Sequence, residues 1–360
     1  MNGAGKDKEK RMGKILVISE TDVRRCLTMS MAIDGVVSAY VQKTSGEGVI
    51  FPLVCHDFIT GRADMDIKSG EAKDSGIFGL KVVTWFGDNV SLGLPALSAT
   101  TLLMDNATGL LLAMLNASGI TGMRTGAAGA VGIKYLARPE SEVMLMVGCG
   151  GQAPYAIAAV LTAMGHVRQI FLYEPVDPES VALKAGAIRT AVDEILGADR
   201  SASAKDNEKG SALDYELIPV TDLEHSVRTS DIIVTATPSR KPLIKKEWVR
   251  PGTHISAMGA DMSGKQELDA QILETALVFA DDRNQSMTVG ECEGAVKEGL
   301  IAAEKITEIG DVIQGSAPGR RSEKDITVFD SSGIALQDLI VAKEIYDQAK
   351  AGGLGTWVQL

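Results

Sequence analysis

Short apolar runs separated by turn residues characterise the chain up to about residue 116. The segment 15–43 predicts a strand and then a helix that Ser19 or Thr21 could cap. The later runs predict strands over residues 49–54, 79–85, 99–105 and 109–115. Asp-Asn-Ala-Thr-Gly at 105–109 separates two of these runs and predicts a hairpin turn. We therefore expect an antiparallel sheet in this region.

After residue 116, helices alternate with short strands that are wholly apolar. The pattern predicts helices over 121–136 and 153–164, and strands over 143–147, 169–173, 217–219, 231–236, 254–258 and 277–280. Such alternation requires right-handed crossovers, which place helices on both faces of a parallel sheet. The polar stretch 197–211 predicts a surface insertion, and 325–350 a last strand and helix. The predicted fold class is α/β, with a Rossmann-type doubly wound parallel sheet.

Composition and charge narrow the range of partners. The 360 residues carry a formal net charge of −11, which disfavours binding to nucleic acid or anionic membranes. No apolar stretch reaches the roughly 20 residues of a membrane span. The four cysteines are widely spaced and no two histidines have ligand spacing, so we expect no disulfide framework, no metal and a cytoplasmic location. A small-molecule partner is the better expectation.

A glycine loop follows the predicted strand 143–147. The loop reads Gly148, Cys149, Gly150, Gly151, Gln152, Ala153 and Pro154, and a helical pattern comes next. Strand, glycine turn and helix bring backbone N–H groups and the positive helix end to a pyrophosphate, although the usual third glycine is absent. We therefore predict a dinucleotide contact at Gly148, Gly150, Gly151, Gln152 and Ala153. The alternative is a tight structural turn.

Glu174 ends the next predicted strand, where an acidic side chain would accept hydrogen bonds from the ribose hydroxyls of a dinucleotide. The same carboxylate would repel a 2′-phosphate. The sequence therefore favours NAD over NADP, and the alternative is a surface glutamate.

Several longer motifs carry a resemblance to a known family. They are GLKVVT at 79–84, MRTGAA at 123–128, PGTHISAMGAD at 251–261, GE at 290–291, EIG at 308–310 and TVFDSSGIA at 327–335. Together they resemble the ornithine cyclodeaminase/mu-crystallin family over nearly the whole chain after the N-terminal tail. That family includes cyclodeaminases, an archaeal-type alanine dehydrogenase, ketimine and imino-acid reductases, and a hormone-binding lens protein.

The resemblance implies two domains with the active site between them. Residues 121–324 would form the dinucleotide-binding domain. Residues 15–120 together with 325–360 would form a second, α+β domain that binds substrate and makes a homodimer through its sheet. Residues 1–14, rich in glycine and lysine, would be a mobile tail.

Carried over residue by residue, the resemblance implies three catalytic residues. Lys81 and Arg124 would anchor the substrate carboxylate, and Asp261 would be the acid/base. Such a set suits an α-amino acid, because its carboxylate must be held while a proton leaves the nitrogen. The alternatives are an exposed strand lysine, a salt-bridge arginine on a helix face, and an aspartate that caps a helix. Ser263 and Gln266 could form a capping box of their own.

The same carry-over places a group of residues near the cofactor. These are Thr125, Thr235, Ala236, Thr237, Met258, Gly259, Lys265 and Ser331. The alternative for Thr237 and Ser239 is that they complete a strand-to-loop turn.

The chain departs from the family pattern at the substrate end. Where members commonly have an arginine after a proline, Leu53 follows Pro52. Lys68 could replace the lost cation, or it could be a solvated edge lysine paired with Asp66. His56 could contact the substrate or be a partly buried structural histidine.

The implied chemistry is transfer of a hydride between NAD and the Cα of a small amino acid, by way of an α-imino acid. An amino-acid dehydrogenase or an imine reductase is our leading hypothesis, with a 2-oxo acid as product or substrate. A redox-neutral ornithine- or lysine-type cyclodeaminase and a non-catalytic crystallin-like binding protein are the alternatives.

Overall fold

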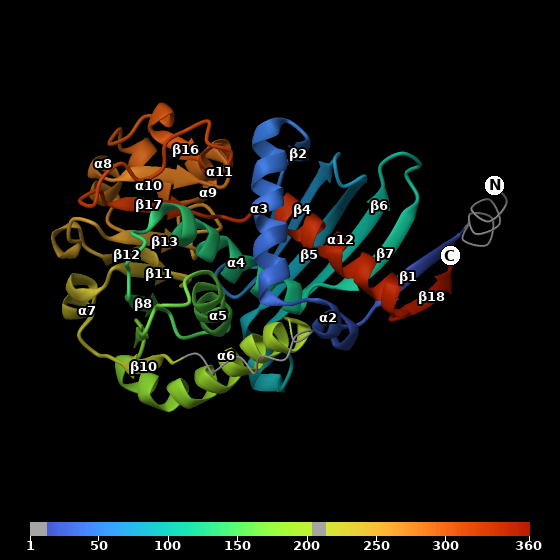
Figure 1. Cartoon of the computed structure of the whole chain (residues 1–360), viewed down its shortest axis with the longest axis horizontal. Helices are drawn as coiled ribbons and strands as arrows, with labels where there is room; N and C mark the ends of the chain where they lie inside the picture. Colours follow the sequence, from blue (N-terminus) through green and yellow to red (C-terminus); the bar gives the residue numbers. More distant parts are fainter. Residues whose placement is uncertain (1–12, 204–213) are drawn as a thin grey trace. The chain divides into compact units, whose positions relative to one another are not determined.

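The computed structural model describes residues 13–203 and 214–360, and these form two compact units (Figure 1). Unit 1 contains the chain up to Leu27, Ser45–Thr121 and Ala335–Leu360, and unit 2 contains Thr28–Thr44 and Gly122–Ile334. Most of the predicted tail and part of the predicted insertion lie outside the described residues. No helix in the described ranges is long and apolar enough to cross a membrane.

Unit 2 is built on a parallel sheet of eight strands in the order β10-β9-β8-β11-β13-β17-β15-β16. The strands are β8 (Val143–Val147), β9 (Gln169–Tyr173), β10 (Glu216–Pro219), β11 (Ile232–Thr235), β13 (His254–Ala257), β15 (Leu277–Ala280), β16 (Ile306–Glu308) and β17 (Thr327–Asp330). Strand order reverses at β8, which pairs with both β9 and β11. This arrangement confirms the predicted doubly wound sheet and creates a switch point at the carboxyl end of β8, where ligands bind in such folds.

Helices separate most of the strands of unit 2 along the chain. They are α3 (Met29–Ser45), α4 (Ser118–Leu136), α5 (Ala153–Ala163), α6 (Val181–Ser203), α7 (Leu223–Thr229), α8 (Ala270–Thr275), α9 (Arg283–Val289), α10 (Glu291–Lys297) and α11 (Ile309–Ile313). Short strands β12 (Arg240–Ile244) and β14 (Gln266–Leu268) pair apart from the main sheet. Alternate buried residues of the sheet form an apolar core with α7, α8 and α10.

Unit 1 is a sheet crossed by one long helix. Its strands are β1 (Lys14–Ile18), β2 (Gly48–Ile50), β3 (Val54–Ile59), β4 (Ala63–Ala72), β5 (Ile77–Phe86), β6 (Leu97–Asp105), β7 (Leu111–Asn116) and β18 (Thr356–Gln359). The pairs are antiparallel except for β1 with β7. Helix α12 (Ala335–Gly352) packs across β4, β5 and β6 (Figure 1). The predicted hairpin turn at 105–109 is confirmed, with Gly109 at φ +73°.

Four details differ from the sequence predictions. The segment 15–43 contains two helices, because the chain is extended at Leu27 between α2 (Glu20–Cys26, capped by Ser19) and α3. Residues 28–44 belong to unit 2. Residues 325–334 also belong to unit 2, because β17 pairs with β13 and β15 on its two sides. The predicted strand 49–54 is interrupted at Pro52, which has no N–H to donate.

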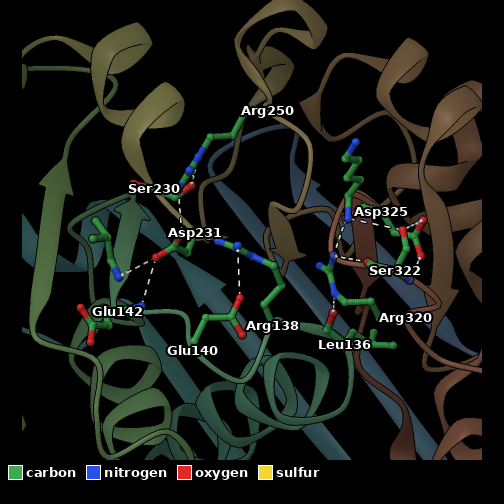
Figure 2. A network of polar contacts seen from close by, with 12 residues as sticks. Leu136, Arg138, Glu140, Glu142, Ser230, Asp231, Arg250, Arg320, Ser322 and Asp325 are labelled. Atoms are coloured by element: carbon green, nitrogen blue, oxygen red, sulfur yellow. Dashed lines mark hydrogen bonds and ion pairs between the residues drawn. The ribbon is translucent and has the colours of Figure 1, made fainter.

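Ion pairs and hydrogen bonds of charged side chains connect the amino ends of the central strands of unit 2 (Figure 2). The Asp231 carboxylate accepts from the backbone N–H groups of Glu142 and Val143, at 3.0 and 3.2 Å. It also accepts from the guanidinium groups of Arg138 and Arg250, at 2.7 and 2.6 Å. This cluster therefore fixes the start of β8 and β11, at the edge opposite to the switch point.

Candidate active site

The glycine loop connects β8 to α5 as predicted. Gly148 has φ +98°, and a Cβ there would lie 2.7 Å from the carbonyl oxygen of Ala236, so only glycine fits. Gly150 and Gly151 are exposed, and a Cβ on either would meet nothing within 4 Å. Gln152 is the N-cap residue of α5 and Ala153 its first residue. The loop therefore presents open space in front of a helix N-terminus of the kind that binds phosphate.

Glu174 follows β9 directly, beside this loop. Its side chain is 14% exposed, and its Oε2 accepts from Lys184 Nζ of α6 at 2.8 Å. The charges of this pair affect the Cys149 thiol of the glycine loop. Burial, and then the Glu174 charge, raise the pKa of Cys149 to about 11, while the Lys184 charge lowers it. The predicted ribose contact therefore lies at the glycine loop and carries a counter-ion.

Close helix packing positions Arg124 and Thr125 on α4. A Cβ on Gly122 would lie 2.4 Å from the Tyr155 ring, and one on Gly126 would lie 2.4 Å from the Tyr155 carbonyl oxygen, so α4 approaches α5 closely. Arg124 is buried, at 7% exposure. Four of the predicted cofactor residues line a small pocket at the carboxyl ends of the central strands: Thr125, Gln152, Ala236 and Met258.

A fully buried carboxylate, Glu267, holds the two loops that follow β11 and β13. Its Oε2 accepts from Thr235 Oγ1 at 2.7 Å and from Gly259 N–H at 2.8 Å. Its Oε1 accepts from the N–H and the hydroxyl of Thr237, both at 2.7 Å. The hydroxyls predicted to lie near the cofactor are thus used to anchor the loops.

A second buried acid, Glu291, supports the first. It accepts from the backbone N–H groups of Glu267 and Leu268, at 2.6 and 3.1 Å. Burial, followed by the neighbouring Glu267 and Asp330 charges, raises the pKa of Glu291 well above its usual range. Burial also raises the pKa of Glu267, but its four hydrogen-bond donors act in the opposite direction. Of the two acids, Glu267 is the one built to carry a negative charge.

Asp261 lies in the loop after β13, and its Oδ1 accepts from Lys265 Nζ at 2.5 Å. Asp261 is 45% exposed and Lys265 17%. The interpretation of Asp261 as a helix cap is wrong, because no helix begins between Asp261 and α8, and the N-cap of α8 is Asp269. The predicted capping box is wrong as well, since Ser263 Oγ donates to Glu293. Two predicted residues, one acidic and one from the cofactor set, therefore form one ion pair.

Ser331 belongs to a buried group at the end of β17. Its hydroxyl donates to Asp281 Oδ2 at 3.0 Å. The neighbouring Asp330 carboxylate accepts from Cys292 N–H at 3.0 Å, and burial raises its pKa to about 7. The hydrogen bond to Asp281 holds the Ser331 side chain in place, while a direct contact between Ser331 and a cofactor stays a prediction.

The two predicted substrate lysines of unit 1, Lys81 and Lys68, lie on the sheet face that packs against α12. Lys81 is 1% exposed and its Nζ donates to Asp338 Oδ1 of α12 at 2.8 Å. Lys68 is 7% exposed and is the direct cross-strand neighbour of Lys81. Both are interior strand residues, so the exposed-lysine and edge-lysine interpretations are wrong. Asp66 is buried on the same face, two residues before Lys68.

His56 differs from these lysines. It is exposed on β3, opposite Met65, and its ring makes an edge contact with Phe58 at 4.9 Å between centroids. The partly buried interpretation is therefore wrong, and a substrate contact stays a prediction. The described residues contain no cluster of three or more His, Cys, Asp or Glu that could hold a metal.

Two supporting acids, Glu267 and Asp338, were not predicted from the sequence, and Glu291 entered only as part of a family motif, without a role. The sequence did indicate that Asp338 is unusual, because Gln337 and Asp338 interrupt an apolar run from Ile334 to Val341. Polar residues at core positions of a helix indicate a buried partner. Nothing in the sequence indicated the role of Glu267, since an acidic residue in a short segment between a loop and a helix is common.

The fold and the loop geometry define a class: unit 2 is a Rossmann-type dinucleotide fold, with its glycine loop at the switch point and an acid ending the next strand. Within this class, the chain belongs to the ornithine cyclodeaminase/mu-crystallin family, whose model matches residues 14–195 and 182–353.

Individual relatives agree with this membership. An alanine dehydrogenase of Archaeoglobus fulgidus is 36% identical over 345 residues, which cover 96% of this chain and 98% of that protein. The structure of an archaeal alanine dehydrogenase dimer with bound NAD has a TM-score of 0.80 and 33% identity, covering 96% and 99% of the two chains. The iminosuccinate reductase of Paracoccus denitrificans in complex with NAD⁺ has a TM-score of 0.83 and 30% identity, covering 96% and 100%.

Proposed function

We propose that this protein is an NAD(H)-dependent oxidoreductase that acts on the C–N bond of a small α-amino or α-imino acid. The observation that carries the proposal is that this member of the family has an open glycine loop at the switch point together with buried Lys81 and Arg124. Relatives that span nearly the full chain are an alanine dehydrogenase and an iminosuccinate reductase, and solved relatives contain NAD.

The residues of unit 2 fit the cofactor. Backbone N–H groups at Gly150, Gly151 and Gln152 would bind the pyrophosphate, and Glu174 would accept from the ribose hydroxyls. Thr125, Ala236 and Met258 would line the nicotinamide end. NAD⁺ held there would supply a hydride acceptor for the substrate Cα, and NADH would supply the hydride for the reverse reaction.

Lys81 and Arg124 would hold the substrate carboxylate. Arginine supplies a planar pair of donors that matches a carboxylate, and lysine adds a second cation. Burial makes such contacts strong, because little water competes for the anion. Lys68, next to Lys81, would take the place of the missing family arginine.

Asp261 would move the proton. Oxidation of an amine requires its nitrogen to shed a proton first, and reduction of an imine requires that proton to be supplied. The Lys265 ammonium keeps the carboxylate oriented by their ion pair. Asp261 is partly exposed, so protons can pass from it to water.

One assay tests the proposal. The protein is incubated with NAD⁺ and a panel of L-amino acids, then with NADH, ammonia and 2-oxo acids, while NADH absorbance and products are recorded. We expect net formation of NADH with a small amino acid, or its loss with a small imino or 2-oxo acid. Conversion of ornithine or lysine with no net change in NADH would establish a cyclodeaminase instead. Binding of NADH without turnover of any substrate would indicate a crystallin-like protein.

Arg124→Ala provides the matched variant for this assay. Turnover should be lost and substrate affinity should fall, because the carboxylate loses its paired donors, while NADH binding is retained. Arg228→Ala is the control, since Arg228 lies on α7 in an exposed ion pair with Glu224. Wild-type kinetics in Arg124→Ala would show that the carboxylate is held elsewhere.

We also infer a homodimer formed through unit 1 and a cytoplasmic location. The archaeal alanine dehydrogenase that resembles this chain is a dimer. The four cysteines are widely spaced in the sequence and form no Cys-x-x-Cys pair, which suits a reducing compartment.

A further inference from the structure

Lys184 is a charged residue at the predicted ribose end that the proposed chemistry does not use. It lies near the start of α6, which follows β9, and its ammonium is 2.8 Å from Glu174 Oε2. Glu174 is largely covered, at 14% exposure, whereas Lys184 is 41% exposed and has room to turn. A lysine with three donors on a flexible stem can follow a partner that moves.

The pair changes what the end of β9 presents to a cofactor. A lone carboxylate at this position accepts from the 2′- and 3′-hydroxyls of NAD and repels the 2′-phosphate of NADP. With an ammonium in contact, the local charge sums to zero, and the repulsion felt by a phosphate a few ångströms away falls. The ammonium is also itself a donor for that phosphate.

We propose that Lys184 is a specificity-determining residue that reduces the preference of this site for NAD(H) over NADP(H). The inference rests on the proposed function, because it assigns a role within that same dinucleotide site. It makes Glu174 the group that favours NADH and Lys184 the group that limits how strongly NADPH is rejected. The two side chains set the preference together.

Binding measurements on four proteins test the inference. Dissociation constants for NADH and NADPH are measured by fluorescence titration with wild type, Lys184→Met, Glu174→Gln and the double variant, at low and high salt. Methionine keeps the length and apolar stem of lysine without its charge. Lys246→Met is the control, because Lys246 pairs with Glu274 elsewhere in unit 2 and its loss changes the net charge equally.

The expected results differ in direction. Lys184→Met should raise the ratio of the NADPH constant to the NADH constant about tenfold or more, and Glu174→Gln should lower it below the wild-type value. The effect of Lys184→Met should shrink at high salt, because the ammonium is partly exposed. The double variant should lie between the single variants.

Two outcomes would overturn the inference. If Lys184→Met weakens both cofactors equally, or changes the ratio no more than Lys246→Met does, then Lys184 only braces Glu174. Failure of the proposed function gives a different result: the wild-type protein binds neither dinucleotide, or it binds NADH without turning over any substrate in the panel assay, which leaves the ratio of the two constants measurable.

Discussion

Asp261 and Lys265 form an ion pair in the loop after β13, and no helix follows for Asp261 to cap. The ion pair therefore does not contribute to capping a helix. Asp261 is 45% exposed, so its replacement by the similarly shaped asparagine should cost little folding stability. A substitution here separates chemistry from structure.

We expect Asp261→Asn to lower kcat by about two to four orders of magnitude, the usual contribution of a positioned acid or base. The melting temperature and the NADH dissociation constant should stay near the wild-type values. Steady-state kinetics on the substrate found in the panel assay check this. A kcat within a few-fold of wild type would remove Asp261 from the mechanism.

His254 shows how burial sets a protonation state. The side chain is fully buried in unit 2, with Nδ1 2.9 Å from Thr327 Oγ1 and Nε2 3.0 Å from Ser256 Oγ. Burial, and then the Arg320 charge, lower its pKa from 6.5 to about 3. The folded protein therefore keeps His254 neutral at pH values where the unfolded chain binds a proton.

This difference predicts a loss of stability in acid. Because the folded pKa is depressed, the contribution of His254 is complete above pH 6.5 and is lost as the pH falls towards 3. Between pH 6.5 and 5 the loss should be about 2 kcal/mol. The stability advantage of wild type over His254→Asn should shrink by that amount in urea unfolding at the two pH values. The raised pKa of Asp330 has the opposite sign, but it is common to both proteins and cancels. An advantage independent of pH would contradict the assignment.

At the scale of elements, Glu267 joins β11 and β13 through the loops that follow them. Four donors on Thr235, Thr237 and Gly259 converge on one buried carboxylate. A glutamine at this position has one acceptor oxygen in place of two, so its amide nitrogen would face donors. Glu291 offers a comparison, since its raised pKa makes it closer to a neutral acid already.

We expect Glu267→Gln to lower the free energy of unfolding by about 1–3 kcal/mol, the cost of buried donors left without an acceptor. NADH binding should weaken as well, because the loops bearing Ala236 and Met258 lose their anchor. Glu291→Gln should cost less in both measurements, since one amide oxygen still serves the Glu267 N–H. Denaturant unfolding and NADH titration test both variants. An equal effect of the two substitutions would contradict the charge assignment.

Local patterns were enough to predict most elements of the fold. The apolar strands β8, β9 and β11 and the glycine loop each depend on a few neighbouring residues, and the structure has them where the sequence indicated. The placement of α3 and β17 in unit 2 depends on partners far along the chain, which no local pattern records. The same limit explains the wrong capping box at Ser263, whose hydroxyl partner, Glu293, is 30 residues away.

The candidate site shows the same division. The glycine loop, Glu174 and the buried lysines were predicted from motifs, whereas their supporting acids were not. Asp338 reaches Lys81 from a helix 257 positions later in the sequence. Lys184 contacts Glu174 only because α6 follows β9 and packs beside the loop. Pairings of this kind follow from the fold.

At the scale of the whole molecule, unit 1 exposes a group of large apolar side chains on β3 and in the turn after β5. Every residue of β3 is exposed, and the exposed apolar side chains on β3 and in the turn after β5 include Val54, Phe58, Ile59, Val90, Leu92 and Leu94. Phe58 also contacts Phe86 at the end of β5, at 5.5 Å between ring centroids. Groups of exposed apolar side chains often mark an interface between proteins.

We therefore expect the protein to sediment as a homodimer at micromolar concentration. Phe58→Asp should shift it towards the monomer, because a charge buried in an apolar interface has no partner. Leu110→Asp is the matched control, since Leu110 is as exposed as Phe58, at 54% and 51%, but lies in the turn between β6 and β7. Analytical ultracentrifugation of the three proteins decides the matter. A wild-type monomer with full activity would contradict the inferred dimer, and equal dissociation of both variants would place the interface elsewhere on unit 1.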